Sequence, residues 1–165
     1  MMHEAVHMVL MGLLVSVAPP AVILPTRRYY DWHAFSVPAW FALPAFVVVH
    51  GAIMLTMDDV ESRPLLSYPV HTALFLGAVM FWLPVLGRVR RLSEAGRCVY
   101  LFVAAPTLDL AGVVMVAQGK AVGGLSMIVG MLPIGLITVW LTWRWVVADE
   151  RSVRASEMLA STRGA

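Results

Sequence analysis

Long apolar segments separated by short polar ones make up most of this chain. Five apolar segments are each about 20 residues long or longer, enough for a helix to cross a hydrocarbon core of about 30 Å. Charged and turn-forming residues interrupt them at 26–32, at 58–64, at 88–94 and at the turn Gln118-Gly119-Lys120. The pattern predicts five transmembrane helices near residues 5–25, 34–57, 65–87, 96–117 and 122–147.

Short-range signals refine these helices. Ser93 followed by Glu94 favours a helix start, because a serine side chain caps free N–H groups and an acid complements the helix dipole. Ser126 and Gly130, four residues apart, allow close approach of another helix. Prolines inside the spans predict kinks whose freed carbonyl groups are satisfied by neighbouring helices. These prolines are Pro19, Pro20, Pro44, Pro84, Pro106 and Pro133.

The composition agrees with a membrane protein. Of 165 residues, 60% are hydrophobic and 13% charged, and the mean hydropathy is +0.80; soluble domains carry more charge. Met1-Met2-His3-Glu4 lacks the positive charge of a signal peptide, so we expect the first segment to be a retained span. The fold expected is an all-α, polytopic bundle of five helices over residues 1–147, followed by a polar tail, 148–165, that is frayed or a short surface helix.

Arginine and lysine predict the orientation, because they concentrate on the cytoplasmic side. With five spans, only Arg63 and Lys120 fall on the side of the N-terminus, which is therefore predicted to lie outside. Tryptophan and tyrosine also gather at the opposite, cytoplasmic ends, as an interfacial belt would: Trp32, Trp82, Trp140, Trp143, Trp145, Tyr29 and Tyr30. The cytoplasmic arginines are Arg27, Arg28, Arg88, Arg90, Arg91, Arg97, Arg144, Arg151, Arg154 and Arg163.

Histidines and methionines collect near the outer face. At 1.5 Å of rise per residue, His50 and His71 lie roughly 10 and 9 Å below it, on consecutive helices. His3, His7 and Met11 follow at i, i+4 and i+8, which places them on one helix face. His50, Met54 and Met57 share another face, and Met127 and Met131 a third. Among the five histidines, only His33 belongs to the cytoplasmic side.

Imidazole and thioether groups together suit copper. Thioether sulfur is soft and selects Cu(I), whereas carboxylates, which magnesium, calcium and manganese prefer, are scarce at this depth. The predicted metal ligands are His3, His7, His50, His71, Met54, Met57 and Met127. Asp58, Asp59 and Glu61 of the outer loop form an acidic rim that attracts cations. Asp109, roughly 12 Å deep in the fourth span, either orients a ligating histidine or pairs with a hydroxyl group.

Two other interpretations stay open. His50 and His71 are also suitable axial ligands of a b-type haem, which would make the chain an electron-transfer subunit. Alternatively, the histidines and methionines serve packing alone, in a structural accessory subunit of a respiratory complex.

No nucleophile–base pair or nucleotide-binding motif is recognisable, so we do not expect an enzyme. We expect the lipid bilayer, and not nucleic acid, as a partner. Whether the chain forms a homo-oligomer is left open. Cys98, the single cysteine, is expected to be an inert thiol.

Several motifs of the chain share one further similarity. The segment 70–87 contains His71 and ends in Phe81-Trp82-Leu83-Pro84-Val85-Leu86-Gly87. This run resembles the Phe-Trp-x-Pro-Val-Leu-Gly motif of the polytopic CtaG family of cytochrome c oxidase assembly factors. Further similar elements are His3-x3-His7-Met8, Ala18-Pro19-Pro20, Leu92-Ser93, Arg97, Tyr100-Leu101, Gly123-Gly124 and Met127. The chain looks like a shortened and divergent member; His50, for example, is followed by Gly51-Ala52 instead of the family's x-Pro.

The resemblance implies a copper-handling role. A CtaG-like protein would help to mature a haem-copper oxidase by supplying copper at the outer face of the bacterial plasma membrane. Its partners would be oxidase subunits or another copper carrier. Carried over to this sequence, the family's histidines correspond to His3, His7, His50 and His71, the same residues that the depth argument brings together.

Overall fold

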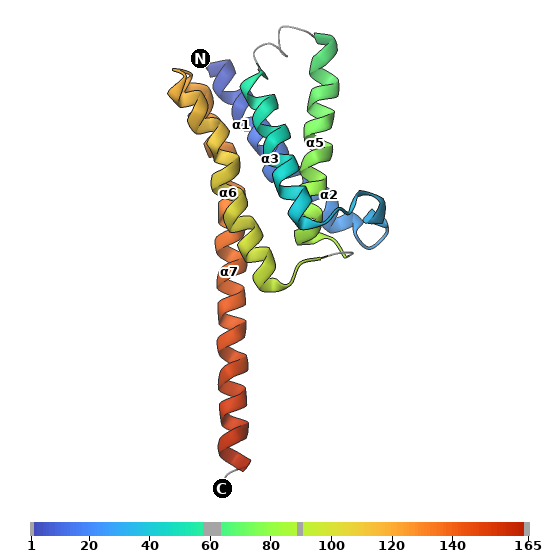
Figure 1. Ribbon diagram of the computed structural model, residues 1–165, viewed down its shortest axis with the longest axis vertical. Coiled ribbons are helices and arrows are strands. Elements are labelled where there is room, and N and C mark those ends of the chain that lie inside the picture. Colours follow the sequence, from blue (N-terminus) through green and yellow to red (C-terminus); the bar gives the residue numbers. More distant parts are fainter. Residues whose placement is uncertain (1, 58–63, 89–90, 164–165) are drawn as a thin grey trace.

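A computed structural model describes residues 2–57, 64–88 and 91–163, and within them every regular element is a helix. The chain folds into a bundle whose last helix projects far beyond the others (Figure 1). Four helices are long and apolar enough to cross a membrane, which supports a multi-pass membrane protein. In chain order the helices are α1 (Met2–Ser16), α2 (Ala18–Thr26), α3 (Ala39–Leu55), α5 (Pro64–Leu86), α6 (Glu94–Ala117) and α7 (Ala121–Arg163).

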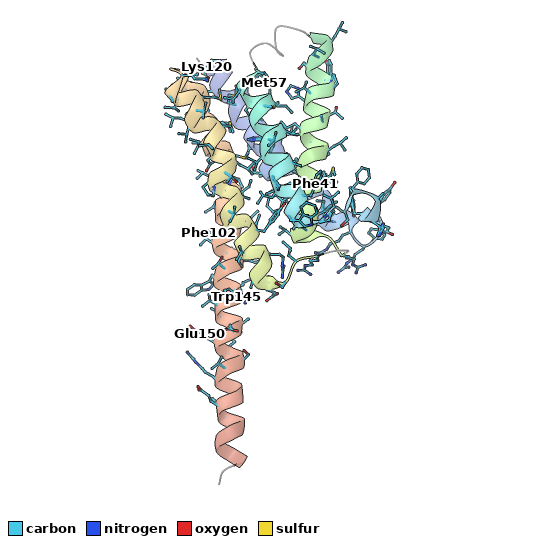
Figure 2. All side chains as sticks on the ribbon, in the orientation of Figure 1. Phe41, Met57, Phe102, Lys120, Trp145 and Glu150 are labelled. Atoms are coloured by element: carbon cyan, nitrogen blue, oxygen red, sulfur yellow. The ribbon has the colours of Figure 1, made fainter. Side chains whose placement is uncertain are left out.

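The helices form a closed ring around one hydrophobic core. Helix α1 packs against α7, α7 against α6, α6 against α3, α3 against α5, and α5 against α1, while α2 packs on α5. The N-terminus and the α6–α7 turn lie at the end where α3 finishes, which we call the N-terminal end (Figures 1 and 2). The other end carries Arg27, Arg28, Arg88, Arg91, Arg97 and Arg144, and we call it the arginine-rich end. The described helix ends thus place these arginines at the end of the bundle opposite the N-terminus, and the membrane topology stays a prediction.

The first predicted span is interrupted by its two prolines. Helix α1 ends at Ser16 and α2 begins at Ala18. Pro19 has no N–H group to donate to the carbonyl of Val15, four residues earlier. The indole Nε1–H of Trp82 donates to that carbonyl instead, at 3.0 Å. A neighbouring helix thus satisfies a carbonyl group freed by proline, as predicted. Trp82 is fully buried, so its assignment to the interfacial belt was wrong; it belongs to the core.

Helix α3 is shorter than its predicted span. It begins at Ala39 rather than at residue 34, because Pro38 holds an extended conformation and restricts the residue before it. A separate 3-10 turn, Trp32–Phe35, precedes it. With 17 residues, α3 is about 25 Å long, somewhat less than the hydrocarbon core. Helix α3 is therefore not one of the four helices long enough to cross, and a fifth crossing remains a prediction.

Helix α7 is longer than its predicted span. It continues without a break to Arg163, so the polar segment 148–163, predicted as a tail that is frayed or a short surface helix, belongs to the same helix as the span. The segment after residue 147 contains neither proline nor glycine before Gly164, and either residue would favour a helix end. Glu150 and Arg154 add an ion pair one turn apart at 3.5 Å. Figure 1 shows this part of α7 extending away from the bundle.

The remaining helix ends follow the sequence closely. Ser93 caps α6, as predicted, with its hydroxyl accepting a hydrogen bond from the Gly96 N–H at 3.1 Å. Gly119, at φ +86°, makes the turn between α6 and α7, a conformation that other residues rarely adopt. The backbone of Gly130 lies directly against that of Gly12 and Val9 in α1, which confirms the predicted close helix approach.

Candidate functional site

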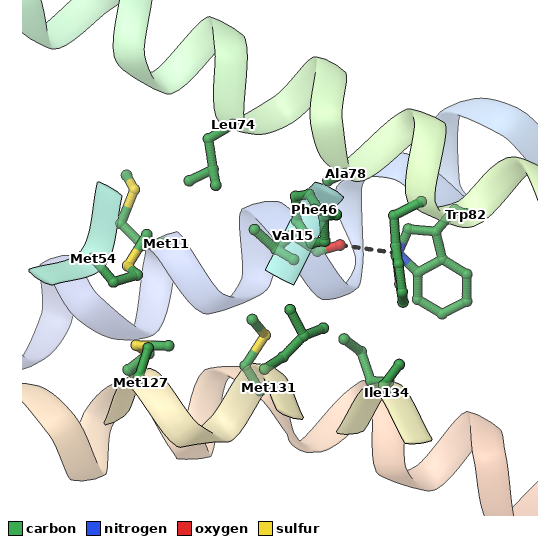
Figure 3. Packing of buried hydrophobic residues seen from close by; sticks show 14 of the residues in the cluster. Met11, Val15, Phe46, Met54, Leu74, Ala78, Trp82, Met127, Met131 and Ile134 are labelled. Carbon is green, nitrogen blue, oxygen red and sulfur yellow. Dashed lines mark hydrogen bonds between the residues drawn. The ribbon is translucent and has the colours of Figure 1, made fainter. Parts of the chain in front are cut away.

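Methionine side chains from several helices line the interior of the ring. Met54 on α3, Met57 just beyond the end of α3 and Met127 on α7 are each no more than 2% exposed, and all three belong to one cluster of buried residues. Met11 and Met131 belong to the same cluster, and Figure 3 shows Met11, Met54, Met127 and Met131 extending into this region from α1, α3 and α7. The structure therefore brings three predicted thioether ligands into one core. Thioether groups there serve as packing or as soft ligands.

His50 is the most unusual polar residue of this interior. It lies one helical turn before Met54 on the buried face of α3 and is 1% exposed. Its ring lies beside that of Phe46, with centroids 5.7 Å apart. Neither of its ring nitrogens has a hydrogen-bond partner among the described residues. Burial of such a polar group is unfavourable unless a partner satisfies it, and a metal ion is one such partner.

His7 and His71 form a second group. Their rings, from α1 and α5, lie 6.0 Å apart between centroids in an edge-to-face arrangement. A metal bound to one nitrogen of each ring would lie roughly 3 Å from each centroid, given metal–nitrogen bonds of about 2 Å. The observed separation is therefore compatible with a shared ion. Both histidines are half-buried.

The backbone fixes the tautomer of His71. Its Nδ1 lies 2.6 Å from the carbonyl oxygen of Ser67, one turn earlier on α5. A carbonyl oxygen only accepts hydrogen bonds, so Nδ1 carries the proton and Nε2 carries the free lone pair. Metal-binding histidines are commonly oriented by such a bond. Ser67 was not predicted as part of the site, although its spacing of four residues from His71 in a helix indicates this contact.

The two groups are distinct in the structure. His71 has its ring contact with His7 and His50 has its own with Phe46, so the equal depth of His50 and His71 does not make them ring neighbours. In the parts of the chain that are described, no three or more His, Cys, Asp or Glu residues are grouped as a metal site. The side chain of His3, and Asp58, Asp59 and Glu61 entirely, lie outside the described residues.

Asp109 has one carboxylate oxygen without a hydrogen-bond partner among the described residues, and its predicted role stays a prediction. It is half-buried on α6, and its Oδ1 atom is buried without a hydrogen-bond partner among the described residues. Among the described residues, Oδ1 therefore contacts neither a ligating histidine nor a hydroxyl group. The nearby Thr107 hydroxyl instead donates to carbonyl groups of its own helix. Cys98 is a buried free thiol, as expected.

Comparison with known proteins adds no further constraint. Searches against protein-family models, curated proteins and solved structures found no match to this chain. Residue chemistry, geometry and the resemblance of its motifs are therefore the arguments for a function.

Proposed function

We propose that this chain is an integral membrane protein that binds Cu(I) in its interior and assists the copper loading of a haem-copper cytochrome c oxidase. One observation carries the proposal: His50 is buried, both of its ring nitrogens lack a hydrogen-bond partner in the described residues, and it is adjacent to a methionine-rich core. Imidazole and thioether together suit Cu(I) better than hard cations. The resemblance to the CtaG family supports the oxidase as the recipient.

The proposed binding groups are His50 with Met54, Met57 and Met127 in the interior, and His7 with His71 beside them in the ring. His3 and the acidic residues of the segment 58–61 are proposed to attract and pass on the ion from the outer face of a bacterial plasma membrane. Transfer requires release, so the affinity has to be moderate. The protein carries copper without forming or breaking covalent bonds in a substrate, which is why we do not propose an enzyme.

Copper content tests this proposal. The wild type, purified in detergent under reducing conditions after growth with copper, is expected to retain roughly one copper per chain. His50→Leu should lose most of it, and His71→Ala a part. His33→Ala is the matched control, because His33 is exposed at the arginine-rich end. Equal copper in the wild type and His50→Leu would overturn the proposal.

The visible spectrum of the same samples separates the alternatives. Cu(I) is colourless, whereas a haem bound by two histidines gives a Soret band. A Soret band that disappears in His50→Leu or His71→Ala would make the chain a haem protein. A folded wild type that holds neither metal would favour an accessory subunit in which these side chains only pack.

A further inference from the structure

A polar cavity lies at the arginine-rich end, away from the candidate copper site. It has a volume of about 370 Å³ and lies between the start of α6, the residues just before it, and the middle of α7. Figure 2 labels Trp145, one of its lining residues, near the start of α6. The residues that define its chemistry are Arg91, Glu94, Arg97, Trp143, Arg144 and Arg151.

Positive charge dominates this cavity. Four arginines line it against a single glutamate. Arg97 is 8% exposed, and its guanidinium donates to Glu94 at 3.1 Å. Its buried Nε has no acceptor among the described residues. Arginine stays protonated in proteins, so this N–H is a donor held in place without an acceptor.

The arginines also lack sufficient counter-charge. Desolvation, and then the charges of Arg97 and two further arginines, lower the pKa of Arg91. Neighbouring guanidinium groups repel one another unless an anion lies between them. Phosphate groups suit such a cluster, because guanidinium groups donate to phosphate oxygens in pairs.

An apolar groove shares one lining residue, Trp143, with the cavity. It is lined by Phe102 on α6 and by Thr138, Val139, Thr142, Trp143 and Val146 on α7. Trp143 is 69% exposed and Phe102 72%, which is expected of side chains that face lipid. A charged cavity and an apolar groove that share the Trp143 side chain fit a molecule with a phosphate head and a hydrocarbon tail.

We propose that the arginine cavity binds a phosphate group, and that its carrier is an anionic phospholipid whose acyl chain lies in the groove along α6 and α7. Basic pockets between helices at the cytoplasmic face are suited to such headgroups. This inference does not depend on copper binding. It concerns the opposite end of the bundle and different residues.

Tryptophan fluorescence provides the test, because Trp143 and Trp145 line the cavity. The full chain in detergent is titrated with brominated phosphatidylglycerol, which quenches tryptophan on contact, and with brominated phosphatidylcholine. The wild type should show about tenfold stronger quenching by the anionic lipid, given four arginines around the headgroup. Arg144→Gln/Arg151→Gln should lose this preference. Both side chains are exposed, so the fold should tolerate the change.

The control removes the same charge elsewhere. Arg28 and Arg154 are exposed and lie outside the cavity, so Arg28→Gln/Arg154→Gln should keep the preference. The proposed lipid site is wrong if the control variant loses the preference for anionic lipid to the same extent, or if Arg144→Gln/Arg151→Gln keeps it. Inorganic phosphate at constant ionic strength distinguishes the carrier. The lipid assignment is wrong, and free phosphate is the ligand, if two results occur together. Inorganic phosphate would displace the brominated phosphatidylglycerol at concentrations similar to those at which the lipid binds, and brominated phosphatidylcholine would quench as strongly as brominated phosphatidylglycerol.

Discussion

Two buried polar side chains in the core, Trp82 and His50, show opposite outcomes of burial. Trp82 donates its indole N–H to the carbonyl of Val15, a group that Pro19 leaves without its usual helical donor. His50 has no such partner among the described residues. Sequence could place both residues inside spans, but it could not show which polar atoms find partners, because partners come from other helices. Only packing distinguishes a structural polar group from a candidate ligand.

Substitution of His50 by leucine should affect stability in opposite directions with and without copper. Leucine fills a similar volume and removes two buried polar atoms that have no hydrogen bond, so the copper-free protein should become more stable by about 1 kcal/mol or more. With Cu(I) present, the wild type should gain stability and the variant should not. Thermal unfolding in detergent, with and without Cu(I), measures both.

The matched control is His33→Leu, at an exposed position of the arginine-rich end. It should leave the copper-dependent gain unchanged. If His50→Leu destabilises the copper-free protein, then the imidazole contributes to packing or to a hydrogen bond after all, and the ligand role loses its main support.

Trp82→Phe should destabilise the protein. Phenylalanine keeps most of the ring packing against Phe81 but lacks the N–H that satisfies the Val15 carbonyl. A buried acceptor left without its donor costs about 1 to 3 kcal/mol. Trp40→Phe is the control, since Trp40 is 78% exposed, and it should change the free energy of unfolding by less than about 0.5 kcal/mol. Equal effects of the two substitutions would contradict this account of the α1–α2 break.

At the level of elements, the helices follow from the apolar pattern, while their lengths depend on particular residues. The spans at 65–87 and 96–117 were predicted to within a few residues, because polar loops bound both of them. Pro38 shortens α3, and the proline pair at 19–20 divides the first span. The continuation of α7 to Arg163 was missed because polar composition was taken to end the helix, whereas the segment has no helix-breaking residue.

The contact between α1 and α7 should be sensitive to one methyl group. A Cβ atom at Gly130 would lie 2.7 Å from the Val9 carbonyl oxygen and 2.9 Å from the Gly12 Cα. These are backbone atoms, so the two helices would have to separate and the hydrogen bond from Ser16 Oγ to the Gly130 carbonyl, 2.9 Å long, would weaken. Gly130→Ala should therefore destabilise the fold by about 1 to 3 kcal/mol.

Gly135→Ala provides the comparison on the same helix. A Cβ there meets no atom within 4 Å, so the change should be neutral or stabilising by up to about 1 kcal/mol, given the higher helix propensity of alanine. Chemical or thermal unfolding of both variants in one detergent checks the difference. Similar effects would show that helix propensity, and not close packing, decides the outcome.

For the whole molecule, the ring of helices decides which predicted residues meet. The structure places the ring of His7 beside that of His71 and groups Met54, Met57 and Met127 in one core, whereas depth along the helices had paired His71 with His50. Depth contains no information about position around the ring, so it could not separate His50 from His71. For the same reason the arginine cavity was not predicted. In the sequence, Arg97 and Arg144 indicated only the orientation of the chain, because they line one cavity only after α6 and α7 have packed together.

The orientation of the bundle is the last prediction. The N-terminal end should face outward, because cytoplasmic loops and ends concentrate arginine and the arginine-rich end holds most of these residues. In a Cys98→Ala background, Gln118→Cys and His33→Cys place single exposed thiols at opposite ends of the bundle. A membrane-impermeant maleimide added to intact cells should label Gln118→Cys, and label His33→Cys only after permeabilisation. The reverse pattern would place His50 and its methionines near the cytoplasmic face, where they would take copper from inside the cell, and would exclude delivery at the outer face.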